Sequence, residues 1–234
     1  MRTDALLSRY GYCSRKEAPA WVRAGRVTLE DGTAVTAARQ NADPARVLVD
    51  GRPVPFPNGL YAAFHKPLGC TCSHKEDGAL IYDLLPPEWL RRNPPVNTVG
   101  RLDKETSGLI LITDDGAFEH AMTSPRRHVP KVYEFTTTAP IPAEAVATFA
   151  AGTLLLNGET TPCKPAELEI TAACAGRLTL HEGRYHQVRR MLAAVGAPVL
   201  ALQRVEIGPL RLADLHLQPG EWRAFTPDIF SPQA

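Results

Sequence analysis

The sequence predicts an α+β protein in which a small helix–helix–sheet unit precedes a larger domain with a mixed, largely antiparallel sheet flanked by helices. A segment rich in proline, PVPFPNG at 53–59, divides the chain with linker or turn chemistry. The part before it fits two short helices and a small sheet. The part after it alternates strands and helices through short and long connections, which favours this class. We therefore expect domains over 1–54 and 61–234, joined by a linker at 55–60.

The first domain is expected to open with a short helix. Thr3 or Asp4 supplies a cap, the helix runs through Tyr10, and Gly11 follows as a stop signal. Farther on, strands are expected near 27–29 and 46–49.

A second helix is expected after the capping box that Ser14 and Glu17 form. Pro19 is compatible with this helix only if it begins near Ala18, because proline is poor in a helix interior. Gly25 fits the position just past its end. One face of the helix carries apolar residues at helical spacing, namely Ala18, Trp21 and Val22.

In the larger domain the pattern predicts both element types. Strands are expected over Tyr61–Phe64, Leu109–Thr113, Val132–Thr137, Leu154–Leu156, Leu168–Ile170, Arg177–Leu180, Val199–Leu202 and Trp222–Phe225. Helices are expected over Ala117–Thr123 (ended by Pro125), Ala143–Ala150 and Tyr185–Val195. In the last helix Val188, Met191, Leu192 and Val195 form the stripe expected to be buried.

Composition describes an ordinary globular chain. Of 234 residues, 44% are hydrophobic and 22% charged, and the five cysteines are too scattered for a disulfide framework. The N-terminus lacks the pattern of a signal peptide, and no apolar run approaches the roughly 20 residues of a membrane helix. We therefore expect a cytoplasmic protein with reduced thiols and no membrane contact.

Basic residues gather in two regions although the net charge is only +1. Residues 1–54 hold nine Lys or Arg against six Asp or Glu, and residues 183–211 hold five Arg against the single acid Glu206. Such clusters suit a polyanion bound on one face, although charge counts alone favour an ordinary solvated surface.

Two groups of residues invite a metal interpretation that we reject. Cys70, Cys72 and His74 lack the fourth ligand and the spacing of a structural zinc site, so buried thiols explain them better. Asp103, Asp114 and Asp115 could form a carboxylate site, but Asp114 and Asp115 precede Gly116 in a strand-to-helix turn, where an Asp bonds its own backbone or caps the next helix. The sequence predicts no metal.

The stretch GRLDK at 100–104 is harder to explain, because it places a carboxylate between an Arg and a Lys just before a very apolar run. The segment EGRYHQVRRMLAAVG at 182–196 raises a related question. Its basic side chains His186, Arg189 and Arg190 lie off the buried stripe. They form either a solvated basic face or a cleft wall with one Arg paired to a carboxylate, and spacing alone does not decide.

The motifs in their order resemble the pseudouridine synthase superfamily over essentially the whole chain. The similar stretches are Gly100–Asp103, Thr106–Leu109, Lys131–Tyr133, Gly183–Met191, HKPLGCTCS, ITDDG, TSPRRH, ALQRVEIGPLRL and LQPGEWR. Tyr-His-Gln-Val at 185–188 is most similar to the branch that modifies bacterial small-subunit (16S) ribosomal RNA. SRKEAPAWVRAGRVTLEDG, within residues 2–51, resembles the RNA-binding module named for ribosomal protein S-four.

The resemblance implies an isomerase that converts a uridine of ribosomal RNA to pseudouridine without a cofactor. It implies Asp103 as the catalytic carboxylate, Arg189 as its ion-pair partner, Tyr133 as the ring that stacks on the extruded uracil, and Leu202 as packing beneath the site. Further RNA-binding residues are expected at Arg101, Lys104, Arg184, His186, Arg190, Arg15, Lys16, Arg23 and Arg26. The expected partner is ribosomal RNA or its assembly particle, bound by a monomer.

Other functions stay open at this point. The same reaction on large-subunit or transfer RNA is the nearest alternative. A ribosome-assembly factor that keeps the fold without the chemistry is another, although Asp103, Tyr133 and Arg189 are all present. A hydrolase that pairs Asp103 with Glu105 or Asp114 is weaker, since no extended sugar-binding aromatic pattern accompanies it.

Overall fold

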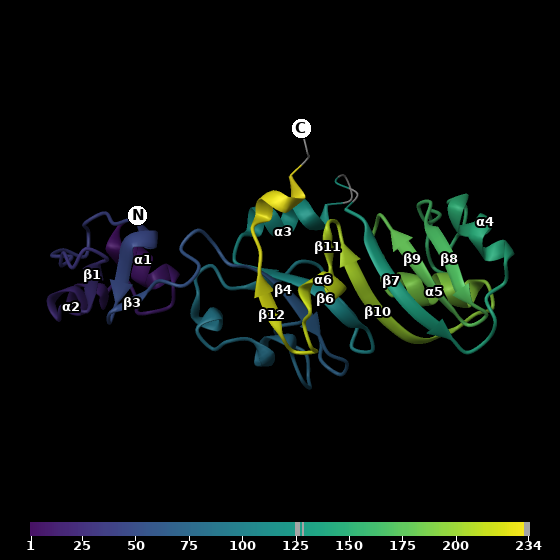
Figure 1. Cartoon of the computed structure of the whole chain (residues 1–234), viewed down its shortest axis with the longest axis horizontal. Helices are drawn as coiled ribbons and strands as arrows, with labels where there is room; N and C mark the ends of the chain where they lie inside the picture. The colour runs from purple at the N-terminus through teal and green to yellow at the C-terminus, as the bar shows by residue number, and fades with distance from the viewer. Residues whose placement is uncertain (125–126, 128, 232–234) are drawn as a thin grey trace.

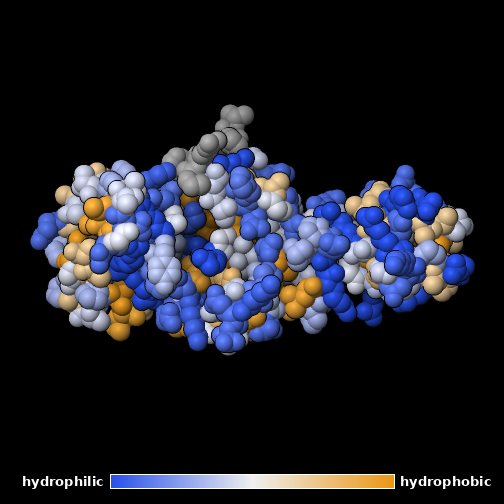
Figure 2. Space-filling model, turned by 180° about the vertical axis from the view of Figure 1, so that it is seen from behind, coloured by the Kyte–Doolittle hydropathy of each residue, from blue (hydrophilic) through white to orange (hydrophobic). Residues whose placement is uncertain are grey.

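A computed structural model describes residues 1–124, 127 and 129–231 of the chain. It forms a small N-terminal lobe and a larger body, joined by a narrow connection (Figure 1). The smaller lobe stands apart in the space-filling view, where much of its surface is hydrophilic (Figure 2). None of the helices that the structure describes is both long enough and apolar enough to cross a membrane.

The N-terminal lobe packs two helices on a three-stranded antiparallel sheet of order β1-β2-β3. Its own apolar core includes Leu6, Leu7, Val22, Val27 and Val47. The elements are α1 (Thr3–Arg9), α2 (Ala18–Arg23), β1 (Val27–Leu29), a 3-10 turn (Pro44–Arg46), β2 (Val47–Val49) and β3 (Arg52–Pro53).

The two helices begin where local chemistry allows. Ser14 and Glu17 form the expected reciprocal pair, with the Glu17 carboxylate accepting from the Ser14 amide at 2.8 Å. Helix α2 starts only at Ala18, which places Pro19 in its first turn, where no helical amide is needed. The expected cap of α1 is wrong, because Thr3 is already helical and Arg2 stands at the cap position without a side-chain hydrogen bond.

A nine-stranded sheet forms the body. Its main order is β12-β4-β6-β10-β7-β9-β8, with β5 beside β6 and β11 beside β10. Among the described strands the pairing of β6 with β10 is the parallel one, and the others are antiparallel. The strands are β4 (Tyr61–Lys66), β5 (Asn97–Thr98), β6 (Ser107–Thr113), β7 (Lys131–Thr137), β8 (Glu167–Ala172), β9 (Ala175–Leu180), β10 (Val199–Ile207), β11 (Leu210–Arg211) and β12 (Trp222–Ala224).

The parallel pairing requires a glycine. Gly108 lies opposite Arg204, and a Cβ on Gly108 would stand 2.2 Å from the Arg204 carbonyl oxygen. Its φ of +110° adds a second reason for a residue without a side chain. The close approach brings the loop that precedes β6, with Asp103, beside strand β10.

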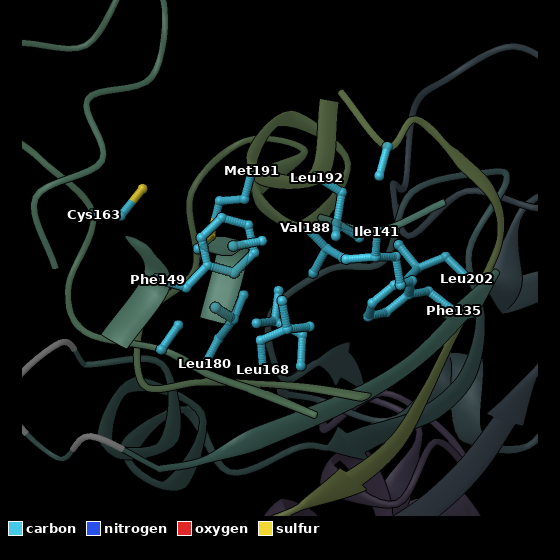
Figure 3. Packing of buried hydrophobic residues seen from close by; sticks show 14 of the residues in the cluster. Phe135, Ile141, Phe149, Cys163, Leu168, Leu180, Val188, Met191, Leu192 and Leu202 are labelled. Carbon is cyan, nitrogen blue, oxygen red and sulfur yellow. The ribbon is translucent and has the colours of Figure 1, made fainter. Parts of the chain in front are cut away.

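Helices and turns cover the sheet. They are α3 (Gly116–Thr123), α4 (Glu144–Ala150), α5 (Gln187–Ala194), α6 (Leu212–Leu215) and 3-10 turns over Ile81–Leu84, Trp89–Arg91 and Pro227–Phe230. The predicted stripe of α5 is confirmed for Val188, Met191 and Leu192, which are buried against sheet residues such as Phe135 and Leu180 (Figure 3). Helix α3 begins with the expected Asp115 cap, whose carboxylate accepts from the amides of residues 117 and 118. Pro125, its expected stop, lies outside the described residues.

Two expectations about the body are wrong in detail. No strand forms over Leu154–Leu156, because this apolar segment lies in a loop where Leu156 fills the core and Leu155 is exposed. The Leu154 carbonyl accepts from the Cys163 amide within the same loop. The short elements β5, β11 and α6 were not expected, since two to four residues give no measurable periodicity.

A fully buried ion pair fastens the linker to the body. The Arg92 guanidinium lies 2.8 Å from the Asp114 carboxylate, with both side chains at most 2% exposed. Arg92 also donates to the carbonyls of Pro55 and Phe56, and Asp114 accepts from the Leu60 amide at 2.8 Å. One guanidinium therefore joins the chain after β3 to the end of β6.

The N-terminal lobe contributes to the same junction. The Tyr10 ring lies against Arg92, whose Cζ is 4.7 Å from the ring centroid, and the Tyr10 hydroxyl donates to the Pro57 carbonyl. The Asn93 amide donates to the Arg9 carbonyl at 2.8 Å. Helix α1 is thus attached to the body by side-chain and backbone bonds.

Candidate active site

A cleft of about 760 Å³ opens over the centre of the sheet. Its walls come from the loop between β5 and β6, strands β7 and β10, and the segment that leads into α5. Residues of interest that line it are Cys72, Arg101, Asp103, Lys104, Lys131, Tyr133, Arg184, His186, Leu202 and Arg204. Segments far apart in the sequence therefore meet at one opening.

A buried lysine holds the loop that carries Asp103. Lys66, at the end of β4, is fully buried, and its ammonium donates to the carbonyls of Pro67, Asp103 and Thr106 at 2.9–3.1 Å. Burial lowers the pKa of Lys66. Lys66 contacts the loop through backbone carbonyls, so it does not engage the Asp103 carboxylate. The sequence analysis did not identify this lysine. The feature that could have indicated it is a charged residue at the end of the mostly apolar segment YAAFHK.

His186, and not Arg189, lies beside the Asp103 carboxylate. The imidazole Nε2 is 3.3 Å from Asp103 Oδ1, and the two side chains are 35% and 29% exposed. His186 caps α5 with left-handed backbone angles, φ +47° and ψ +36°, which a non-glycine residue rarely adopts. Strained backbone of this kind is concentrated at functional sites in proteins.

The expected ion pair between Arg189 and Asp103 is wrong. Arg189 donates to the Glu105 carbonyl at 2.7 Å, and it has no ion pair among the described residues. Arg189 lies one turn into α5, so it contacts the loop two residues beyond the carboxylate. It braces the loop from α5 as Lys66 braces it from β4.

Tyr133 and Leu202 lie where the sequence places them, in the cleft. Tyr133 on β7 is opposite Arg204 on β10, and the Arg204 guanidinium carbon is 6.0 Å from the tyrosine ring centroid. Leu202, 5% exposed, packs beneath the cleft in the same core as α5. The sequence analysis assigned no role to Arg204. It lies on β10 two residues after Leu202, and both residues line the cleft.

Two of the expected RNA-binding arginines are engaged inside the protein. Arg184 donates to the carbonyls of Thr161 and Pro162 and to the Glu182 carboxylate. Arg190 pairs with Glu159 at 2.8 Å and donates to backbone carbonyls. Both arginines fix the loop after α4 against α5, so these contacts do not support their assignment as RNA-binding residues, which stays a prediction.

The other expected basic residues divide into free and paired groups. Arg101 and Lys104 at the cleft are exposed, as are Arg15, Lys16 and Arg23 around α2, and the described ion pairs include none of these five. Arg26 differs, because it pairs with Asp50 at 2.6 Å and lies 3.4 Å over the Trp21 ring. Arg26 therefore supports its lobe, and its assignment as an RNA contact is not supported by its contacts.

No metal cluster forms among the residues that the structure describes. Cys70 and Cys72 are buried thiols whose pKa values burial raises. His74 stacks on Tyr82 with ring centroids 3.8 Å apart. The Asp114 carboxylate forms a buried ion pair with Arg92.

Comparisons with known proteins agree with this arrangement. The family described as RNA pseudouridylate synthase matches residues 60–194. An uncharacterized RNA pseudouridine synthase of Bacillus subtilis, YtzG, is 40% identical, with all of both chains covered. The ribosomal small subunit pseudouridine synthase A of Escherichia coli K12 is 39% identical, over 97% of this chain and 96% of its own.

A solved structure extends the likeness to three dimensions. A crystal structure of a pseudouridylate synthase superposes with a TM-score of 0.68 at 35% identity and covers 98% of each chain. The motif TSPRRH, part of the initial resemblance, lies partly outside the described residues at 125, 126 and 128. The matched region includes the loop of Asp103, strand β7 and helix α5, and the chain belongs to the RNA pseudouridylate synthase family.

Proposed function

We propose that the protein isomerises one uridine of small-subunit ribosomal RNA to pseudouridine, with Asp103 as the catalytic carboxylate. The observation that carries the proposal is a partly exposed carboxylate on a loop held by Lys66 and Arg189, in a 760 Å³ cleft that the Tyr133 ring also lines. Relatives that act on the small ribosomal subunit, by their names, are 39% identical over nearly their whole length.

The reaction breaks the bond between ribose C1′ and uracil N1, turns the base, and rejoins it through C5. An ionised Asp serves as nucleophile or as charge stabiliser beside the junction of sugar and base. Tyr133 offers a ring on which the extruded uracil stacks, and Leu202 packs below it. Extrusion costs a few kcal/mol, which stacking and phosphate contacts offset. Arg101 and Lys104 are proposed to bind those phosphates, and their exposure at the cleft supports this role.

The N-terminal lobe is proposed to be the module that resembles ribosomal protein S-four and to bind RNA through phosphates. Its support is the free, exposed group Arg15, Lys16 and Arg23 around α2, on the lobe surface. Such contacts fix the position of a protein on RNA without reading bases.

Changing Arg15, Lys16 and Arg23 together to Gln is expected to weaken RNA binding and its salt dependence. The slope of log affinity against log salt should fall by about 2, since each phosphate contact contributes about 0.7–0.9 to it. Fluorescence anisotropy at four salt concentrations measures this slope. A matched variant, Arg211→Gln with Arg223→Gln, loses two exposed arginines from the body and should keep the slope. An unchanged slope in the triple variant would refute the role of the lobe.

The function itself is tested by mapping pseudouridines in ribosomal RNA from cells with and without the gene. The expected result is one lost site, in small-subunit RNA. Purified protein should then restore that site in extracted RNA or in assembling particles. Loss of a site in large-subunit or transfer RNA alone would contradict the proposed substrate, and loss of none would contradict the reaction.

A further inference from the structure

Arg204 is a buried cation without a full set of partners. Only 2% of the residue is exposed, and its Nε donates to the Leu109 carbonyl at 2.7 Å. One terminal guanidinium nitrogen is buried and has no hydrogen-bond partner among the described residues. A buried polar group left unpaired is destabilising, so native proteins rarely keep one without a use.

A second cation lies next to it. Lys131 is two residues before Tyr133 on β7, the strand that pairs with β10, and it also lines the cleft. Its ammonium donates to the Val129 carbonyl, at 3.1 Å. Burial, together with the charge of Arg204, lowers the pKa of Lys131 to about 8. The two cations line the same cleft, and the charge of Arg204 disfavours the charge of Lys131.

The described part of the chain places no carboxylate within ion-pair distance of either cation. Asp103, an acid that lines the same cleft, lies beside His186 instead. The other buried arginine, Arg92, shows that this fold can neutralise a guanidinium completely, since Asp114 meets it in the interior. Arg204 and Lys131 are thus an uncompensated positive site that suits an anion from outside the protein.

The position of Arg204 and Lys131 in the cleft indicates which anion they would bind. In the proposed complex the backbone phosphates meet Arg101 and Lys104, which are exposed at the cleft. Arg204 lies deep, with its guanidinium carbon 6.0 Å from the centroid of the Tyr133 ring. A base that stacks on Tyr133 would lie close to this guanidinium, with its carbonyl oxygens within reach.

The chemistry of the proposed reaction creates such an anion. If Asp103 attacks ribose C1′, the electron pair of the C1′–N1 bond leaves with the uracil; if it attacks C6, the C5–C6 pair moves onto the base. In both cases the negative charge of the carboxylate passes to the carbonyl oxygens of the uracil. The charge returns to Asp103 when the carboxylate is released, either as C5 displaces it from C1′ or as it leaves C6 after C5 has joined C1′. C5 then loses its proton and N1 gains one.

Resting on the proposed function, we infer that Arg204 and Lys131 form an anion site for the carbonyl oxygens of the uracil, and that they stabilise the base while it carries the negative charge. Preorganised donors of this kind act mainly on the chemical step, because they bind charge that develops only during the reaction. The ground-state RNA does not need them for its affinity.

The first test compares rates in full-length variants. Arg204→Gln is expected to slow single-turnover conversion by about 10²–10³-fold, the usual effect of removing one such donor, with unchanged RNA affinity. Arg204→Lys should recover part of the rate. Arg177→Met, which removes an arginine engaged with Glu134 and Glu206 on β7 and β10, is the control and should keep the wild-type rate.

The second test separates chemistry from structure. A substrate RNA with 5-fluorouridine at the target carries a more acidic base, which needs less help as an anion. The defect of Arg204→Gln, measured as single-turnover loss of the N1-linked nucleotide, should therefore be smaller on this RNA. An equal defect on both RNAs would show a structural role and overturn the inference.

The third test concerns stability. Lys131→Met removes the half-buried one of two repelling cations, so it should raise the melting temperature of the free enzyme while it slows conversion. A residue kept for structure would instead lower the melting temperature when replaced. A lowered melting temperature, or a wild-type rate, would overturn the role of Lys131.

The closing experiment needs no turnover. NMR titration compares the binding of 5-nitrouracil, largely an anion at neutral pH, with that of neutral thymine. Wild-type protein should bind the anion more tightly, and Arg204→Gln should lose this preference. Equal binding of the two by wild type would overturn the inference even if uridine is converted. A preference that depends on Arg204 would support the anion site even if no ribosomal RNA were modified.

Discussion

Asp103→Ala is expected to lower the single-turnover rate of uridine isomerisation by about 10³-fold or more, as for other residues on which a reaction depends. RNA affinity should stay near the wild-type value. The reason is geometric: Lys66 and Thr106 bond the backbone carbonyl of residue 103, so they hold the loop whether or not a carboxylate is present. Conversion is measured by nucleoside chromatography after one turnover.

The control for this variant replaces another acid in the same loop, two residues after Asp103. Glu105→Ala removes an exposed carboxylate from the same loop but keeps the carbonyl that Arg189 contacts. It should retain most of the activity. Residual conversion by purified Asp103→Ala at more than a few per cent of the wild-type rate would show that another residue carries the reaction.

Arg92→Met is expected to destabilise the protein by about 3–5 kcal/mol, the usual cost of removing one partner of a buried ion pair. The change leaves Asp114 buried without its guanidinium and frees the carbonyls of Pro55 and Phe56. Urea unfolding, followed by tryptophan fluorescence because Trp89 is buried near this region, measures the loss.

A double-mutant cycle separates the pair from its surroundings. Arg92→Met combined with Asp114→Asn should cost less than the sum of the two single changes, because no uncompensated charge remains. As a matched control, Arg46→Met breaks an exposed pair with Glu30 and should cost at most about 1 kcal/mol. If Arg92→Met cost no more than this control, the junction would have no role in stability.

The sequence predicts elements well where periodicity is long. Of the eight strand segments expected in the larger domain, seven overlap observed strands, and the α5 stripe is buried at Val188, Met191 and Leu192 as its spacing predicts. Leu154–Leu156 has the same local pattern, yet its loop buries only Leu156. Apolar character indicates burial, and burial does not by itself require a strand.

The site shows where local reasoning stops. The family motifs place Asp103, Tyr133 and Leu202 at the cleft, and the structure brings all three there. They do not show that His186, rather than Arg189, faces the carboxylate, because that depends on a left-handed residue that ends the loop before α5.

Buried charged side chains are the second feature that the sequence does not predict. Lys66 and Arg204 would be assigned to solvent by residue type, since lysine and arginine are rarely fully buried. Only the three-dimensional pairing of β4, β6 and β10 reveals that one meets backbone carbonyls and the other keeps an unpaired nitrogen.

The parallel pairing of β6 with β10 has a consequence for when the enzyme can fold during its synthesis. Arg204 bonds a carbonyl 95 positions earlier, so this contact waits for almost the entire polypeptide to leave the ribosome. Contacts so distant along the chain form slowly. A partly synthesised chain therefore lacks a competent centre even after its N-terminal lobe has emerged, and modification cannot begin before translation is nearly finished.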